Sequence, residues 1–262
     1  SWVEHAKKYV ELMKERFDLD SNSFILEIGS NDGYLLQHAL KLKIPCLGVD
    51  PSTGAASVAQ AKGIPTITTF FTKKLAKAIL KNEVKADLIC GINVFAHVPD
   101  INDLVAGMAI LLKPNGVMTM EFPHLLKLVE EVQFDTIYHE HYFYYTLLCV
   151  KQIVEAHGMR LFDVEQLPTH GGSLRVFACP ESSKHQNSGN VEAVLKKEQQ
   201  AGMDQLEFYL NFQDKINKIQ FSLMRFLMEA KEQGMKIAAY GAAAKGNTLI
   251  NYYGIKKHLL PY

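Results

Sequence analysis

Residues 138–142, Tyr-His-Glu-His-Tyr, gather several side chains that can move protons. Histidine titrates near neutral pH and can take a proton from a substrate. Tyrosine or a second histidine can donate a hydrogen bond to an oxygen that becomes negative, as in an enolate. Tyr138 and His141 are three residues apart, so they face one pocket only if this segment is a turn or a helix. The pattern predicts acid–base chemistry that makes a carbon atom nucleophilic.

Two other interpretations of this segment remain open. His139 and His141 with Glu140 are metal-ligating residue types, but histidines two apart reach one ion only from an extended segment, and a further ligand is needed. No obvious further ligand is present in the sequence. The segment can also be an aromatic-rich loop in solvent. We expect no metal site.

A glycine-containing turn at residues 27–33, Glu-Ile-Gly-Ser-Asn-Asp-Gly, follows a short apolar run and precedes a helical one. Gly29 and Gly33 allow close approach of a ligand and backbone angles that a side chain forbids. Asn31 stands where a third glycine is expected, and asparagine tolerates such angles. Asp50 ends the next apolar run, where an acid can accept both hydroxyls of an adenosine ribose.

The acids in this turn favour one cofactor over another. A dinucleotide needs glycines in the Gly-x-Gly-x-x-Gly spacing, whereas Gly29 and Gly33 lack the middle glycine. Glu27 and Asp32 would repel a pyrophosphate but suit the ammonium and sulfonium groups of S-adenosylmethionine. We therefore predict S-adenosylmethionine. An NAD-dependent oxidoreductase and a plain strand-to-helix turn without a ligand are the alternatives.

Further candidates follow other predicted strands. Ligands bind beyond the carboxyl ends of parallel strands, so residues 91–97, which include Asn93 and His97, are expected beside the transferred group. Phe70, which follows the third strand, is a candidate for contact with the adenine. A lone histidine is more often structural than functional, but the position of His97 just past a predicted strand makes the two readings equally good.

Two glycine-containing segments carry cations. Residues 170–175, His-Gly-Gly-Ser-Leu-Arg, combine free backbone amides with Arg175, whose guanidinium fits phosphate or carboxylate. Residues 241–246 with Lys245 open a helix and can hold a phosphate. An edge hairpin with an exposed arginine and an ordinary helix start are the plain readings of these two segments.

The elements that must position these residues alternate in type. Apolar runs at 24–28, 46–50, 64–68, 86–90 and 117–122 read as strands, and helical patterns separate them. This alternation predicts an α/β fold with a mostly parallel sheet and helices on both faces. A helix over 2–17 precedes the sheet, Lys113 to Gly116 read as a turn, and residues 161–165 and 174–178 read as two more strands at its edge.

The composition changes near residue 181, which suggests three parts. Residues 1–180 form the cofactor-binding domain, and residues 181–232 form a helical connector. Residues 233–262, with a strand over 236–240 and a following helix, read as the beginning of a second, truncated α/β domain.

Charge and composition exclude several classes of protein. The 262 residues include 28 Lys+Arg and 28 Asp+Glu, and this neutral balance argues against a nucleic-acid partner. No apolar run is long enough to cross a membrane, and residues 1–5 do not resemble a secretion signal. Four cysteines occur singly, as expected for buried free thiols in a reducing compartment. We expect a cytoplasmic protein.

Taken together, these segments resemble the S-adenosylmethionine-dependent sugar C-methyltransferases that act on nucleotide-linked deoxysugars. The resemblance covers essentially the whole chain and is carried by the segments at 27–33, 121–124 (Glu-Phe-Pro-His), 134–141 (Phe-Asp-Thr-Ile-Tyr-His-Glu-His), 170–175 and 240–248 (Tyr-Gly-Ala-Ala-Ala-Lys-Gly-Asn-Thr). It implies a class I methyltransferase domain, which is Rossmann-like. It also implies methylation at C3 of a 4-keto-6-deoxyhexose on a nucleoside diphosphate.

The same resemblance implies roles for single residues. His141 matches the base that removes the C3 proton, and Tyr138, Glu140 and His97 match its neighbours in the active site. Arg175 and the loop with Lys245 are expected to face the nucleotide diphosphate.

Two features of the family are missing from this sequence, namely a cysteine-rich zinc domain at the start and a complete second α/β domain. The alternatives are an O- or N-methyltransferase on the same scaffold and a non-catalytic module that binds an adenosyl ligand. The oligomeric state stays open.

Overall fold

A computed structural model describes residues 2–82, 84–241 and 244–260. In this part of the chain a seven-stranded sheet has the order β3-β2-β1-β4-β5-β7-β6. The strands are β1 (Ile25–Ile28), β2 (Cys46–Val49), β3 (Thr66–Ile67), β4 (Ala86–Ile92), β5 (Leu112–Pro123), β6 (Met159–Leu167) and β7 (Ser173–Pro180). Strands β1 to β5 pair in parallel, which confirms the predicted α/β class.

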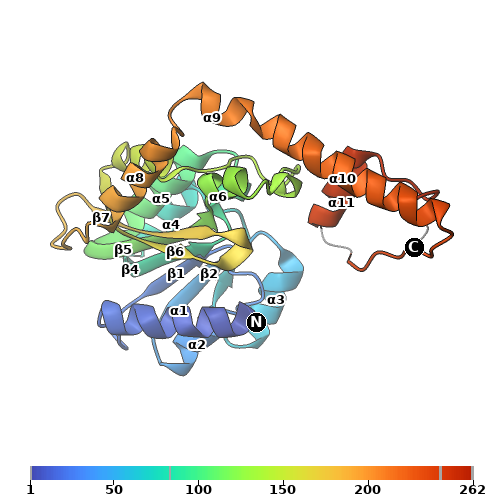
Figure 1. Cartoon of the computed structure of the whole chain (residues 1–262). Helices are drawn as coiled ribbons and strands as arrows, with labels where there is room; N and C mark the ends of the chain where they lie inside the picture. The colour runs from blue at the N-terminus through green and yellow to red at the C-terminus, as the bar shows by residue number, and fades with distance from the viewer. Residues whose placement is uncertain (1, 83, 242–243, 261–262) are drawn as a thin grey trace.

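Helices cover both faces of the sheet (Figure 1). On one face lie α1 (Trp2–Arg16), α2 (Leu36–Lys41) and α3 (Thr53–Ala61), and on the other lie α4 (Lys73–Leu80), α5 (Ile101–Leu111), α7 (Leu147–Glu155) and α8 (Asn190–Ala201). Two apolar cores result, one against each face, and the central strands supply buried side chains to both. A parallel sheet needs this double cover because both of its faces are apolar.

The edge of the sheet beyond β5 is antiparallel, as the two late strands in the sequence suggested. β7 pairs antiparallel to both β5 and β6, and Pro123 at the end of β5 lies opposite Ser173 at the start of β7. The carboxyl end of β5 therefore meets the loop that enters β7. This loop contains η3 (Thr169–Gly171), a short 3-10 helix.

Between β5 and α7 the chain forms α6 (Leu125–Glu130), η2 (Phe134–Thr136) and a turn at residues 138–140. Another 3-10 helix, η1 (Phe95–His97), follows β4. Tyr142 N donates to Ala96 O across 2.8 Å, so the segment after η2 is fastened to the segment after β4. Both segments are thereby held at the carboxyl edge of the sheet.

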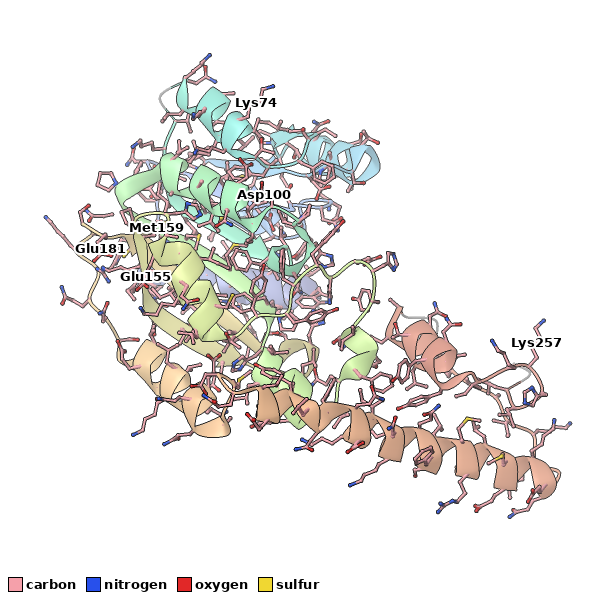
Figure 2. All side chains as sticks on the ribbon, turned by 90° about the horizontal axis from the view of Figure 1, so that it is seen from above. Lys74, Asp100, Glu155, Met159, Glu181 and Lys257 are labelled. Carbon is pink, nitrogen blue, oxygen red and sulfur yellow. The ribbon has the colours of Figure 1, made fainter. Side chains whose placement is uncertain are left out.

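The last part of the chain forms an arm that leaves the sheet (Figure 1). It contains α9 (Leu206–Leu210), α10 (Phe212–Glu232) and α11 (Ala244–Tyr253). Figure 2 places Lys257 at the outer end of this arm and Lys74 on the opposite side of the molecule. α11 returns to the main body, where the Tyr253 ring lies 5.2 Å from the ring of Phe134 in η2. This contact holds the end of α11 against η2.

Three expectations differ from the structure. Residues 236–240, predicted as a strand, have no regular structure, and Tyr240 is fully exposed. A strand needs a partner for its backbone groups, and no described segment pairs with this one. Lys113 to Gly116 form a bulge within β5 rather than a turn, because the ladder passes from Ala86–Leu112 to Leu88–Val117. Cys149 is exposed, whereas the other three cysteines are buried.

No helix among the described residues is long and apolar enough to span a membrane.

Candidate active site

The turn after β1 opens onto a cleft of about 400 Å³. Its three key residues all have left-handed backbone angles, with φ values of 69° at Gly29, 50° at Asn31 and 75° at Gly33. A Cβ atom on Gly29 would lie 2.4 Å from the Val94 side chain, so only glycine allows this close packing. The cleft is lined by Trp2, Gly29, Asn31, Asp32, Tyr34, Ile92, Asn93 and Val94.

Glu27 precedes this turn and is an unusual group. Its side chain is 1% exposed, and neither carboxylate oxygen has a hydrogen-bond partner among the described residues. Burial raises the pKa of Glu27 well above its usual value, and the nearby Asp50 and Asp32 raise it further. A buried acid without a partner is costly, so this turn is suited to a cationic ligand.

Asp50 contacts the turn directly although it does not line the cleft, whereas Phe70 lies away from where it was predicted. The Asp50 carboxylate accepts from the backbone N–H groups of Asn31 and Ser52, each at 2.8 Å. It therefore holds the turn in shape, and each oxygen keeps a second lone pair for a ribose hydroxyl. Phe70 is 73% exposed and does not line the cleft.

A second cavity, of about 90 Å³, lies beside the first. Its lining comes from five separate segments and includes three imidazoles and one ammonium group. The lining residues are Asn93, Ala96, His97, Pro123, Thr136, Tyr138, His141, His170 and Lys245. Asn93 lines both cavities, so Tyr138 and His141 lie next to the cleft at the 27–33 turn.

His141 is held in a defined orientation in the second cavity. Its Nδ1 lies 3.1 Å from the carbonyl oxygen of Thr136, which can only accept, so Nδ1 carries the proton. Nε2 is then the unprotonated nitrogen, and it lies 3.3 Å from the Tyr138 hydroxyl. Burial lowers the pKa of His141 below 6.5, and His97 lowers it further. A neutral imidazole with this tautomer is a competent base.

The residues around His141 contribute unequally. The His97 ring lies edge-on at 4.8 Å between ring centroids, and the Tyr138 ring lies at 4.5 Å. The two are therefore in contact with the proposed base. Glu140 is exposed and does not line the cavity, but its charge acts to raise the pKa of both His141 and Tyr138.

Arg175 lies elsewhere than predicted. Its side chain is buried between two acids, donating from Nη2 to Glu121 and from Nη1 to Glu165, each at 3.0 Å. It lines neither cavity. The alternation of side chains along β7 directs it across the sheet face toward these acids rather than toward the rim. Arg175 is thus a structural ion-pair residue, and the prediction that it faces the substrate is wrong.

Lys245 does reach the second cavity, as the sequence predicted, from the first turn of α11. Residues 242–243 of the predicted phosphate loop lie outside the described residues. Among the described residues, no group of three or more His, Cys, Asp or Glu side chains is arranged to hold a metal ion.

Sequence reasoning missed three lining residues. Trp2 was assigned to the apolar stripe of α1, yet its side chain is 44% exposed and lines the cleft. Tyr34 lines the same cleft, and His170 lines the second cavity. A spacing pattern cannot separate a core residue at a helix end from one that faces a cleft, which is why Trp2 escaped notice.

Comparison with known protein families bears on this geometry. A family model described as "Methyltransferase domain" matches residues 2–164. This range includes β1, β4 and β5, the strands that end at the two cavities. The chain belongs to the S-adenosylmethionine-dependent methyltransferases. A second model, "C-methyltransferase C-terminal domain", matches residues 168–262 of this methyltransferase.

Individual relatives agree with this assignment. The methyltransferase is 34% identical to "C-methyltransferase NovU" of Streptomyces niveus over 97% of its own length, and it spans 61% of that protein. Over 37% of its length it is 31% identical to 40% of "Ubiquinone biosynthesis O-methyltransferase" of Bartonella quintana. Its fold matches the magnesium protoporphyrin IX methyltransferase of Synechocystis PCC 6803 with bound SAM, with a TM-score of 0.52 and 14% identity over 68% of this chain and 79% of that one.

The residues of the first cleft fit S-adenosylmethionine. Asp32 lines the cleft, and the unpartnered Glu27 and Asp50 lie close behind its turn, so this acidic setting suits a ligand with ammonium and sulfonium groups better than a pyrophosphate. Asp32 is the one of these three that has a cationic partner in the structure, with Lys62 Nζ at 2.8 Å. The donor set therefore disfavours a dinucleotide.

Proposed function

We propose that this methyltransferase transfers a methyl group to C3 of a 4-keto-6-deoxy sugar carried on a nucleoside diphosphate. The observation that carries the proposal is the orientation of His141, whose unprotonated Nε2 lies in a small cavity that adjoins the cofactor cleft. Methylation of oxygen or nitrogen does not require removal of a proton from carbon, so it does not need a base in this position. The name of the relative NovU, a C-methyltransferase, supports transfer to carbon.

The chemistry of the substrate matches the lining of the second cavity. The ketone at C4 makes the C3 proton acidic, so an imidazole near neutrality is strong enough to remove it. His141 Nε2 takes this proton, and the electron pair of the C–H bond moves into an enolate. The Tyr138 hydroxyl, which lies beside Nε2, and His97 are placed to donate hydrogen bonds to the enolate oxygen.

The cofactor cleft supplies the second reactant. S-adenosylmethionine, when bound there, provides an electrophilic methyl group on its sulfonium. Asn93 and the turn at 27–33 would hold the cofactor, with the charge of Glu27 behind the turn favouring its cationic end and Asp50 available to its ribose. Because Asn93 borders both cavities, the protein can hold the two reactants in contact, and such positioning supplies much of the rate of methyl transfer.

Lys245 extends the proposal to the rest of the substrate. It is the cation that lines the second cavity alongside three imidazoles. A fixed positive charge at this place favours an anionic substrate, whether through its diphosphate or through the enolate that forms. We assign Lys245 to the anionic part of the nucleotide sugar.

The decisive experiment compares His141→Gln with the unmodified protein. Radiolabelled S-adenosylmethionine and a dTDP-4-keto-6-deoxyhexose are supplied, and the product is analysed for a new carbon–carbon bond. His141→Gln is expected to lower transfer at least 100-fold, as is typical for loss of a general base, while cofactor binding measured by calorimetry is retained. His157→Gln, a partly exposed histidine whose ring bonds to Asn102, serves as the matched control.

Each alternative has its own outcome. Unchanged transfer in His141→Gln contradicts the proposal and favours an O- or N-methyltransferase. Binding of S-adenosylmethionine without transfer to any keto sugar nucleotide favours a non-catalytic module. Preferential binding of NAD in the same calorimeter favours an oxidoreductase.

A further inference from the structure

The loop that enters β7 places a histidine against the residue that borders both cavities. His170 Nε2 lies 2.8 Å from Asn93 Nδ2. An amide nitrogen can only donate, so the imidazole nitrogen accepts and is unprotonated. His170 adopts this position with a left-handed backbone, at φ 52°, which is rare for residues other than glycine.

The contact decides how the Asn93 amide is turned. Since Nδ2 is bound to His170, the oxygen Oδ1 points the other way. This oxygen is buried and has no hydrogen-bond partner among the described residues. Buried polar atoms without partners are uncommon and call for an explanation. Here the atom belongs to a side chain that lines both the cofactor cleft and the second cavity.

We propose that His170 is a positioning residue that fixes the Asn93 amide so that its oxygen accepts from the positively polarised hydrogens at the cationic end of the cofactor. This inference rests on the proposed function, because it requires S-adenosylmethionine in the first cleft. The recognised chemistry is a cation next to polarised C–H or N–H groups. The demethylated product has lost the sulfonium charge, so the oxygen discriminates between donor and product.

The surroundings of His170 are built to keep the ring in place. The Trp2 indole stacks on it, with ring centroids 5.1 Å apart and an angle of 29° between the planes. On either side of His170 the loop is held by hydrogen bonds from Thr169 Oγ1 to Glu121 Oε1 at 3.1 Å and from Gln133 Nε2 to Gly171 O at 2.8 Å. The strained backbone is therefore supported by neighbours from α1, β5 and the segment before η2.

The charges around His170 favour the form that accepts. Burial lowers the pKa of His170, and Lys245 on α11 and His5 on α1 lower it further, whereas Glu121 on β5 raises it. His170 in turn acts to lower the pKa of His141. With the ring neutral, Nε2 stays an acceptor. A proton on Nε2 would turn the amide round and present its N–H groups to the cationic cofactor.

The test measures calorimetric binding of S-adenosylmethionine and of S-adenosylhomocysteine to the purified protein, without a sugar substrate. His170→Phe keeps an aromatic ring for Trp2 but removes the acceptor. This variant is expected to bind S-adenosylmethionine about tenfold more weakly, the usual effect of losing one hydrogen bond to a charged group. The affinity for S-adenosylhomocysteine is expected to change by less than about threefold, because this ligand has no charged sulfonium. His170→Gln, whose amide oxygen can accept from Asn93, is expected to restore the preference.

The outcomes separate this inference from the proposed function. His157→Phe, on a histidine whose Nε2 donates to Asn102 Oδ1 and which lines neither cavity, serves as the control and is expected to leave both affinities unchanged. Equal losses for both ligands in His170→Phe, or no loss for either, overturn the inference and leave the proposed function standing. Failure of the unmodified protein to bind S-adenosylmethionine overturns both. His170→Leu gives the same readout if His170→Phe does not fold.

Discussion

Glu27 is a buried carboxylate without a partner, and its replacement should stabilise the protein when no cofactor is bound. Glu27→Gln keeps the size of the side chain and removes the charge. Because burial raises the folded-state pKa above 4.5, the folded protein binds an extra proton between pH 4.5 and that raised pKa. The free energy of unfolding of the unmodified protein is therefore highest below pH 4.5 and falls as the pH rises toward the folded-state pKa of Glu27. Glu27→Gln does not show this fall.

The structure bounds the size of the effect. Between the ordinary pKa of 4.5 and pH 7 lie about 2.5 pH units, each equivalent to about 1.36 kcal/mol of linkage. The gain in unfolding free energy from Glu27→Gln at pH 7 is therefore at most about 3 kcal/mol, less the small cost of a buried amide. For a chain of this length, about 3 kcal/mol corresponds to a rise in Tm of roughly 6–12 °C.

Thermal unfolding followed by circular dichroism at pH 5, 6, 7 and 8 measures the effect. The difference in Tm between Glu27→Gln and the unmodified protein should grow with pH in the absence of cofactor. With saturating S-adenosylmethionine it should shrink or reverse, since the charged acid then gains a cationic partner. Calorimetry should show S-adenosylmethionine bound about 10- to 100-fold more weakly by Glu27→Gln, the range for a hydrogen bond to a charged group.

Glu121 provides a matched control, because it is the same residue type with the same 1% exposure but with partners in Arg175, His5 and Thr169. Glu121→Gln should destabilise the protein, since it leaves the buried Arg175 with one acid fewer. A lower Tm for Glu27→Gln at pH 7 without cofactor, or a Tm difference that is constant with pH, would refute the reasoning.

Three further predictions concern the second cavity and the sheet edge. The acid limb of the pH profile of kcat/KM should have its midpoint below pH 6.5, because burial lowers the pKa of His141 and protonation abolishes the base; a midpoint above 6.5 would contradict this order of effects. Tyr138→Phe should lower kcat about 10- to 100-fold with little change in cofactor affinity; unchanged kcat would remove Tyr138 from the mechanism. Arg175→Met should lower the unfolding free energy by about 3 kcal/mol, measured by urea denaturation; normal stability with a raised KM for the nucleotide sugar would instead restore its predicted role as a ligand.

Most of the sheet was predictable because its strands are short apolar runs separated by helical patterns. The residues of β1, β2 and β4 are almost all buried, and burial on both faces removes the need for alternation. The prediction failed at 236–240, where an equally apolar run has no strand beside it. Hydrophobicity marks a segment as able to form a strand, but only a neighbour with free backbone groups makes it one.

The candidate site was predictable where local chemistry and topology coincide. The 27–33 turn, Asn93, His97 and His141 meet because they follow strands, or are fastened to segments that follow strands, at one edge of the sheet. Arg175 was misplaced because a cation next to two glycines looks the same whether it faces a ligand or a buried acid. Its partners, Glu121 and Glu165, are 54 and 10 residues away in the sequence, and only the register of β7 reveals them.

The reversal of direction at β7 has a consequence for how such enzymes can diversify. Because β7 runs opposite to β5, a hairpin loop, rather than the crossover helix that a parallel strand would require, borders the second cavity. Hairpin loops tolerate changes in length and sequence more readily than crossover helices do. The turn after β1 can therefore stay constant while the part of this loop beyond His170 changes in length and sequence to fit other acceptors.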